Sequence, residues 1–289
     1  MMETFGQPYE DYRPQGTPAG TLVILPGVNS GAYLMANALP TFERWRVISL
    51  NPPGVNGVPL PLPFSVKAYA RQVVDTLSRL DVKDFVLVGH SLGGYAAQEV
   101  ARLVPDRVKR LVLVSTSRGQ PDTAVDIAGM QKRIGMNFWE FQQHIGKHEG
   151  EGHKPLFGPG FTEREPEIYE TFLKLRRRHL PTQAATLAHL SAGGMFSSMG
   201  FVRKLRVPTL VIHGNADNLV TVDSGRKLCQ SISGAQWLEL YGVGHFPMLE
   251  YASFWDKVRQ FAEEATPGVE MAQPESLLNR IMRGMWVRG

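Results

Sequence analysis

A serine between two glycines is the first feature of this sequence that could carry chemistry. Residues 89–93 read GHSLG and lie where an apolar segment passes into a stretch with helical character. A serine in a sharp, strained turn at such a junction projects its hydroxyl above the edge of a sheet. Gly89 and Gly93 remove side chains that would collide in that turn, and the following helix start places partial positive charge beside Ser91. The pattern predicts Ser91 as a nucleophile, and the alternative is a glycine-rich turn without chemistry.

His245 is the predicted general base, because a serine hydroxyl is a weak nucleophile until a base takes its proton. It lies in residues 242–246, GVGHF, just after the last apolar run of strand length. The neighbouring glycines allow this loop to fold back over the sheet edge. The alternative is a histidine packed in a loop or exposed on the surface. His90 and His213 adjoin strand ends, and for both we expect a structural role.

Asp217 is the predicted carboxylate that orients the histidine and stabilises the imidazolium. It ends the run 213–217, HGNAD, directly after an apolar strand. Asp223 is the competitor, but its surroundings are typical of a helix start, where capping is the expected role. The loop after the preceding strand opens with residues 115–117, STS, and offers no carboxylate.

Acyl transfer also needs N–H donors for the developing oxyanion. One should be the backbone N–H of Leu92, which follows the nucleophile. The other should come from the loop after the first clear strand, where residues 26–29 read PGVN and Val28 is the best candidate.

Apolar segments of strand length alternate with helical patterns, which is typical of a parallel sheet with crossover helices. The predicted strands span residues 21–25, 46–50, 85–88, 110–114, 208–213 and 236–241. Helices are predicted over 65–80, with Ser65 as N-cap, from the serine turn to residue 104, and over 252–264. The predicted fold class is therefore α/β, a mostly parallel central sheet with helices on both faces.

The pattern changes after residue 116, where no convincing strand occurs until about residue 200. We therefore expect an α/β core in residues 1–116 and 201–265, interrupted by a helical cap or lid over 117–200. Residues 266–289 form a tail with an apolar stripe and arginines beside it. Such a tail could dock on the protein or a second copy, or stay disordered; a basic amphipathic helix on a membrane surface is the other interpretation.

The insertion should line a substrate pocket, because it is rich in methionine and aromatic residues. The predicted pocket residues of the insertion are Phe138, Trp139, Phe172 and Met195, each of which could instead be lid-core packing. Phe246, which follows the predicted base, is added to them. Residues 176–178 read RRR. They could bind a substrate carboxylate, but a solvated helix face is the favoured interpretation.

Composition excludes several other classes of protein. The 289 residues carry a formal net charge of +4, and no dense basic run argues for nucleic acid. Cys229 is the single cysteine, so no intrachain disulfide can form. His144 and His148 have helical spacing, but Gly146 lies between them and no firm carboxylate or cysteine partner is recognisable, so no metal is expected. Nothing indicates an organic cofactor. No secretory signal or membrane-spanning run is recognisable, which predicts a cytoplasmic protein of undetermined oligomeric state.

Four separated segments carry a resemblance to a known family. In chain order they are 25–27 (LPG), 89–94 (GHSLGG), 208–217 (PTLVIHGNAD) and 244–247 (GHFP). Together they resemble the α/β-hydrolase superfamily, in the group with a helical cap, over residues 15–265. The resemblance implies the α/β-hydrolase fold and a Ser-His-Asp triad. Pro26 departs from it, because relatives often carry histidine there, and residues 51–54 (NPPG) replace a more usual turn that contains aspartate.

The resemblance also narrows the chemistry. Ser91 argues against the dehalogenase-like and epoxide-hydrolase-like members, which use an aspartate nucleophile. Members that cleave carbon–carbon bonds commonly have asparagine before the serine and tryptophan after the histidine, where this chain has His90 and Phe246. We expect a hydrolase that cleaves an ester, thioester or lactone of a small to medium apolar acyl substrate through an acyl-enzyme. An acyltransferase, a carbon–carbon bond hydrolase and a non-enzymatic ligand-binding protein of this fold remain alternatives.

Overall fold

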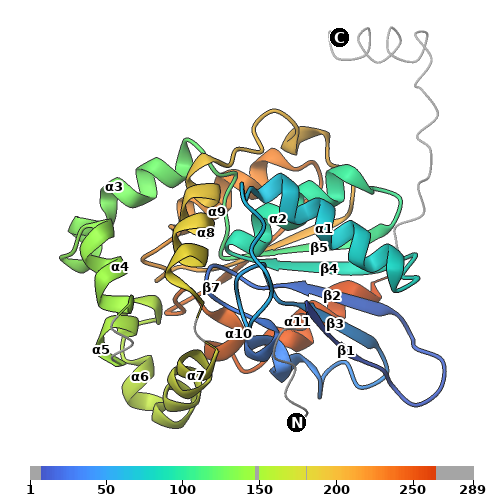
Figure 1. The fold of residues 1–289 in the computed structure, drawn as a ribbon, viewed down its shortest axis with the longest axis horizontal. Coiled ribbons are helices and arrows are strands. Elements are labelled where there is room, and N and C mark those ends of the chain that lie inside the picture. Colours follow the sequence, from blue (N-terminus) through green and yellow to red (C-terminus); the bar gives the residue numbers. More distant parts are fainter. Residues whose placement is uncertain (1–7, 147–149, 180, 265–289) are drawn as a thin grey trace, which may run out of the picture.

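A seven-stranded sheet forms the centre of the protein in the computed structural model, which describes residues 8–146, 150–179 and 181–264 (Figure 1). The strand order is β1-β3-β2-β4-β5-β6-β7, and every neighbouring pair is parallel except β1 with β3. The strands are β1 (Tyr9–Tyr12), β2 (Thr21–Leu25), β3 (Arg46–Leu50), β4 (Phe85–His90), β5 (Val108–Val114), β6 (Thr209–Gly214) and β7 (Gln236–Leu240).

The central strands are continuous runs of apolar residues because helices cover both of their faces. Along β2, Leu22 and Ile24 join one buried cluster and Val23 and Leu25 the other, as the two-residue period of a strand requires. The helices α1 (Val66–Arg79), α2 (Leu92–Leu103) and α9 (Val222–Ser231) pack on the second cluster's face. The 3₁₀ helix η1 (Ala32–Ala38) and helix α11 (Phe254–Glu263) pack on the opposite face, as Figure 1 shows.

The register aligns the carboxyl ends of the strands at one edge. Leu25 pairs with Gly89, His90 with Val114, and Val114 with Ile212. The loops that follow β2, β4, β5 and β6 therefore leave the sheet side by side. This edge is where open parallel sheets place their sites.

Helices occupy the chain between β5 and β6. They are α3 (Asp122–Ile134), α4 (Phe138–Gly146), α5 (Gly150–His153), α6 (Phe161–Arg164), α7 (Pro166–Arg178), α8 (Gln183–Met195) and the 3₁₀ helices η2 (Lys154–Leu156) and η3 (Val202–Lys204). Among the described residues of this stretch, one isolated bridge, Gly119 with Ser197, is the sole β pairing. The division into a core and a cap over 117–200 stays a prediction, and we call residues 117–200 the lid below.

The strands and helices predicted from the sequence match the structure to within a few residues. Helix α1 begins after Ser65, whose side chain accepts a hydrogen bond from the N–H of Ala68 at 3.1 Å, as an N-cap should. Strand β1 was not predicted, because its four residues, YEDY, are all half-buried and show no apolar run. The tail over 266–289 lies outside the described residues, and no helix within them is long and apolar enough to cross a membrane.

Candidate active site

Ser91 occupies the turn between β4 and α2 in a strained backbone conformation, with φ 54° and ψ −119°. Close packing of the backbone around this turn requires glycine at positions 89 and 93. A Cβ at Gly89 would lie 2.5 Å from the carbonyl oxygen of Gly93, and one at Gly93 would lie 2.0 Å from that of Leu25. Strain of this kind persists only where the surroundings hold it, and it is concentrated at functional sites.

The backbone of Ser91 is fixed by hydrogen bonds from the neighbouring strand. Its N–H donates to the carbonyl oxygen of Val114 at 3.0 Å, and its carbonyl oxygen accepts from the Thr116 hydroxyl at 2.9 Å. Gly94 allows this approach, because a Cβ there would lie 2.6 Å from the Thr116 side chain. The absence of a side chain at Gly94 thus lets the start of α2 pack against the loop after β5.

His245 and Asp217 form a buried hydrogen-bonded pair. Nδ1 of His245 lies 2.7 Å from Oδ2 of Asp217. The other oxygen, Oδ1, accepts from the N–H groups of Leu219 and Val220 at 2.9 and 3.0 Å. Burial alone would raise the pKa of Asp217, but His245 and His213 hold it well below its usual value. The carboxylate is thus ionised and aimed at the imidazole, which leaves Nε2 of His245 for another partner.

Two further histidines support this pair, as the structural role predicted for them implies. Nε2 of His213 lies 2.9 Å from the carbonyl oxygen of Val220 and 3.5 Å from Oδ2 of Asp217. Nε2 of His90 donates to the carbonyl oxygen of His245 at 2.8 Å, and the two rings are 4.9 Å apart. Burial chiefly lowers the pKa of His90 to about 3, so this side chain is neutral.

The structure brings the imidazole and the carboxylate into contact and places the serine at the same edge of the sheet. Ser91 follows directly on His90, whose ring lies against His245. Within the described part of the chain, the Ser91 hydroxyl makes no hydrogen bond of its own. Catalytic hydrogen bonds are often long in ligand-free enzymes and shorten when substrate binds.

The loop after β2 passes beside the nucleophile, where the second oxyanion donor was predicted. A Cβ at Gly27 would lie 2.9 Å from the Cβ of Ser91, so only glycine fits. Asn29 then takes a left-handed conformation, with φ 54°, and its side chain accepts from the Thr186 hydroxyl of the lid at 3.1 Å. Val28 lies between these two fixed residues. Leu92 is the first residue of α2, a position whose N–H has no partner within the helix.

Comparison with known proteins is consistent with this geometry. The model of the family described as the alpha/beta hydrolase fold matches residues 20–252. The chain belongs to this family.

Similar proteins include a poly(3-hydroxyalkanoate) depolymerase from Ectopseudomonas oleovorans, 28% identical over 245 residues, which are 83% of this chain and 82% of the relative. A 2-hydroxy-6-oxo-6-(2'-aminophenyl)hexa-2,4-dienoic acid hydrolase from Metapseudomonas resinovorans is 25% identical over 80% of this chain and 79% of its own. The crystal structure of the enol-lactonase from Burkholderia xenovorans LB400 superposes with a TM-score of 0.73 and 22% identity, over 89% and 96% of the two chains. The protein is accordingly a hydrolase.

The lid of this hydrolase is joined to the histidine loop by Glu250, which sequence reasoning did not identify. This carboxylate, on α10 (Pro247–Glu250), accepts from the N–H of Gly158 in the lid at 2.7 Å and from that of Gly244 at 3.1 Å. The N–H of His245 also donates to Leu156 of the lid at 2.7 Å. Burial chiefly raises the pKa of Glu250 to about 7. A glutamate five residues after a histidine has no distinctive pattern, so only the fold reveals this contact.

The five predicted pocket residues do not line one cavity. Phe172 of α7 and Phe246 lie together, with ring centroids 5.2 Å apart, and the ring centroid of Phe246 is 5.5 Å from that of His245. Phe138 and Trp139 line a separate cavity of about 920 Å³ between α3, α4 and α8. Met195 is 71% exposed at the end of α8. The prediction identified apolar residues of the lid and of the histidine loop without resolving which of them lie near His245.

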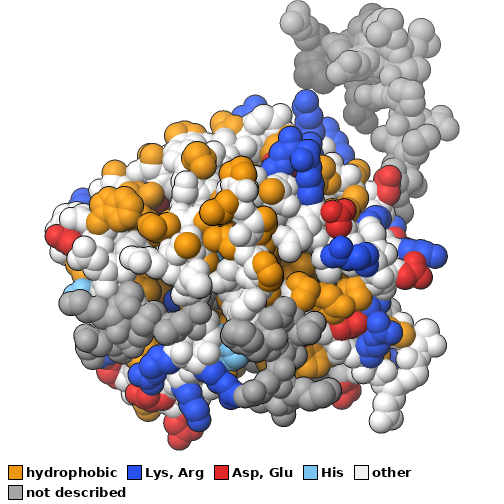
Figure 2. Space-filling model, viewed as in Figure 1, with side chains coloured by type: hydrophobic (Ala, Val, Ile, Leu, Met, Phe, Trp, Pro, Cys, Tyr) orange, Lys and Arg blue, Asp and Glu red, His pale blue; other side chains and the backbone are white. Residues whose placement is uncertain are grey.

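Apolar side chains also reach the surface of the lid. Figure 2 shows them gathered over the face where α3, α4 and α8 lie in Figure 1. Trp139 and Leu187, which line the larger cavity, are among the exposed ones. This surface therefore continues the apolar lining of that cavity outward.

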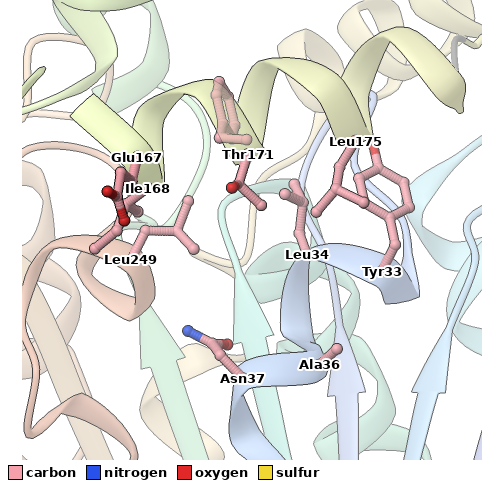
Figure 3. Close-up of a pocket in the computed structure, with 10 residues that line it drawn as sticks. Tyr33, Leu34, Ala36, Asn37, Glu167, Ile168, Thr171, Leu175 and Leu249 are labelled. Atoms are coloured by element: carbon pink, nitrogen blue, oxygen red, sulfur yellow. The ribbon is translucent and has the colours of Figure 1, made fainter. Parts of the chain in front are cut away.

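A second cavity, of about 450 Å³, lies between η1 and α7 (Figure 3). It is mostly apolar, and Phe172 belongs both to its wall and to the aromatic cluster beside His245. Leu34 and Tyr33 line it from η1, and Leu175 lines it from α7.

The arginine run 176–178 does not form a uniformly solvated face. Arg177 and Arg178 are exposed, as predicted, but Arg176 is buried, with 6% of its surface accessible. Its guanidinium lies over the ring of Phe172, 5.6 Å from the ring centroid. Helical geometry explains the difference, because residue 176 follows 172 and 173 on the buried side of α7.

Proposed function

We propose that this protein is a serine hydrolase that cleaves an ester, thioester or lactone of a small to medium apolar acyl substrate. The observation that supports this most strongly is the buried pair of His245 and Asp217, 2.7 Å apart, at the sheet edge that carries Ser91. A structural histidine would not need an ionised aspartate fixed by two backbone N–H groups behind it.

The arrangement supports a two-step mechanism. Ser91 attacks the acyl carbonyl carbon while Nε2 of His245 takes its proton, and Asp217 stabilises the imidazolium. The N–H groups of Leu92 and Val28 donate to the oxyanion as the carbonyl bond to oxygen becomes single. The intermediate collapses as His245 returns the proton to the leaving group, which leaves an acyl-enzyme. Water then attacks this ester by the same route and releases the acid and Ser91.

The relatives support an oxygen ester or a related bond as the target. The names of the two proteins, a poly(3-hydroxyalkanoate) depolymerase and an enol-lactonase, describe hydrolysis of such bonds. Phe246, which contacts His245, and Phe172, which packs on Phe246, make the surroundings of the imidazole apolar. No part of this chemistry requires a cofactor.

Carbon–carbon bond hydrolysis is the second candidate. It is favoured by the matches to hydrolases whose names denote oxo-dienoic acids, at about a quarter identity over most of both chains. His90 and Phe246, which stand where such enzymes commonly have asparagine and tryptophan, favour the ester reaction instead.

Replacing the nucleophile tests the proposal. Ser91→Ala should reduce the kcat/KM for 4-nitrophenyl butyrate by about 10³-fold or more and abolish labelling by a fluorophosphonate. Ser233→Ala is the matched control, because Ser233 is exposed, and it should leave both measurements unchanged. If ester turnover and labelling survive in the Ser91→Ala protein, Ser91 is not the nucleophile.

A further inference from the structure

Arg176 is a buried cation without an anionic partner. Within the residues that the structure describes, its guanidinium forms no ion pair with a carboxylate, and its Nε has no hydrogen-bond acceptor. Burial lowers its pKa, and Tyr33 opposes this shift. An arginine nevertheless stays charged in a protein, and a buried charge is costly unless it is paired. Among the described residues, the guanidinium of Arg176 therefore lacks a hydrogen-bond acceptor for its Nε and an anion to pair with its charge.

Tyr33 presents a second unsatisfied donor beside it. Its buried hydroxyl has no hydrogen-bond partner among the residues that the structure describes. Burial raises the pKa of Tyr33, while Arg176 and the N–H of Gly31 oppose the rise, so these groups are in electrostatic reach of one another. The ring is held by stacking on His179, with centroids 4.6 Å apart. Figure 3 shows Tyr33 extending from η1 toward α7, next to Leu175.

These two donors come from opposite sides of the lid–core junction. Tyr33 belongs to η1 in the core, and Arg176 belongs to α7 in the lid. A carboxylate is purely an acceptor when ionised, and its two oxygens match the donors of a guanidinium. A neutral group would leave the charge of Arg176 unpaired.

The junction lies close to the proposed catalytic centre. Phe172 contacts both Arg176 and Phe246, the residue after His245. The same phenylalanine, together with Tyr33, lines the apolar cavity of Figure 3.

Arg176 does not line this cavity itself, but Tyr33 and Phe172, which lie in its wall, connect it to the guanidinium. The wall also contains one carboxylate, that of Glu167. An apolar ligand that enters here would reach the buried positive charge past Tyr33 and Phe172.

We propose that Arg176 and Tyr33 form a subsite for a carboxylate of the substrate, so that the preferred substrate is an acyl compound bearing an anionic group. The role of this subsite in substrate selection rests on the proposed function. Arg177 and Arg178 do not belong to the subsite, because both are exposed to solvent.

Binding of glutarate tests the subsite without catalysis. Glutarate should raise the unfolding temperature of the wild-type protein and of the Arg177→Met control, compared with 1,5-pentanediol and with sodium chloride at equal ionic strength. Arg176→Met should abolish this shift. The Arg176→Met variant is expected to fold, because an apolar side chain of similar length replaces an unpaired buried charge. A glutarate shift that is absent in wild type, or unchanged in Arg176→Met, would overturn the proposal.

Ester selectivity provides the second test. The mono-4-nitrophenyl ester of glutaric acid and 4-nitrophenyl pentanoate have acyl chains of equal length and differ in charge. The ratio of their kcat/KM values should fall at least about tenfold in Arg176→Met and about threefold in Tyr33→Phe, since hydrogen bonds to charged groups are the stronger ones. Tyr33→Phe keeps the ring and its packing, so it tests the subsite even if Arg176→Met does not fold. An unchanged ratio in the folded variants would contradict the subsite.

The two tests separate this proposal from the proposed function. If neither ester is cleaved but glutarate binding depends on Arg176, the subsite stands and the serine hydrolase assignment fails. If both esters are cleaved through Ser91 and neither glutarate binding nor the ratio depends on Arg176, the assignment stands and the subsite fails.

Discussion

At the scale of single residues, the proposed chemistry depends on how firmly Asp217 is held. Both of its oxygens are engaged, one by two backbone N–H groups and the other by His245. Its depressed pKa means that it remains ionised throughout the neutral range. An ionised, immobile carboxylate can both fix the tautomer of His245 and stabilise its protonated form.

Asp217→Asn should therefore reduce kcat strongly while preserving the fold. The amide keeps the shape of the side chain but loses the charge, and it can donate where an acceptor is needed. We expect a fall in kcat on the order of 10³- to 10⁴-fold, measured with 4-nitrophenyl butyrate.

Asp223→Asn is the matched control, because Asp223 is exposed and pairs only with Arg226 at the surface. Its turnover should equal that of wild type. Equal losses in the two variants, or no loss in Asp217→Asn, would show that Asp217 is not the orienting acid.

At the scale of elements, the lid loop around Gly158 and the histidine loop are fitted to one another. A Cβ at Gly158 would lie 1.9 Å from the carbonyl oxygen of Gly242, and one at Gly244 would lie 2.6 Å from that of Leu156. Two backbone segments far apart in the sequence thus touch directly. The position of His245 depends on this contact as well as on Asp217.

Gly158→Ala should therefore separate the two loops. The methyl group meets backbone, which cannot rotate away, so the free energy of unfolding should fall by about 1–3 kcal/mol and kcat/KM should fall with it. Chemical denaturation and ester kinetics measure the two effects.

Gly194→Ala is the matched control, because nothing lies within 4 Å of a Cβ there. This glycine also lies in α8 of the lid, where alanine is the better helix former. If Gly158→Ala and Gly194→Ala give the same results in both measurements, the lid loop and the histidine loop are not closely packed at Gly158.

The strands and helices of the core could be predicted from the sequence because burial of apolar side chains dominates their stability. The run TLVIL of β2 is buried on both faces, so its composition alone identifies a central strand. The edge strand β1 could not be predicted in this way, because its residues YEDY are half-buried and show no apolar pattern. This strand is stabilised by its pairing with β3. The local sequence pattern of a strand thus predicts its burial well, but it predicts its pairing with other strands poorly.

The site divides in the same way. Ser91, Asp217 and His245 follow strands, so topology alone brings them to one edge. Glu250 and Arg176 owe their positions to packing between the lid and the core. Helical spacing places residue 176 on the same side of α7 as Phe172 and Leu173, but the sequence does not show what that side contacts.

At the scale of the whole molecule, ionisation of the partly buried carboxyl of Glu250 should make the stability of the fold depend on pH. Its carboxyl accepts from Gly158 of the lid and Gly244 of the core. The groups that face it include the ionised Asp217, which adds to the upward shift of its pKa. Since the folded-state pKa is about 7 and the ordinary value is 4.5, the folded protein retains a proton that the unfolded chain loses between these values.

The sign of the resulting pH dependence follows from proton binding. Below pH 4.5 the carboxyl is protonated in both states, and its contribution to stability is fully present. Between pH 4.5 and about 7 the folded state binds more protons than the unfolded state, so this contribution falls as the pH rises. Above about pH 7 the carboxyl is ionised in both states, and the loss is complete.

Glu250→Gln should remove this dependence, because the amide retains an acceptor oxygen for Gly158 and Gly244 but does not ionise. The free energy of unfolding of the variant, relative to wild type, should therefore increase between pH 5 and pH 8, as measured by chemical denaturation at each pH. Glu263→Gln replaces an exposed glutamate on α11 and should show no such trend relative to wild type. If the difference between Glu250→Gln and wild type is the same at every pH, then the carboxyl does not titrate in this window.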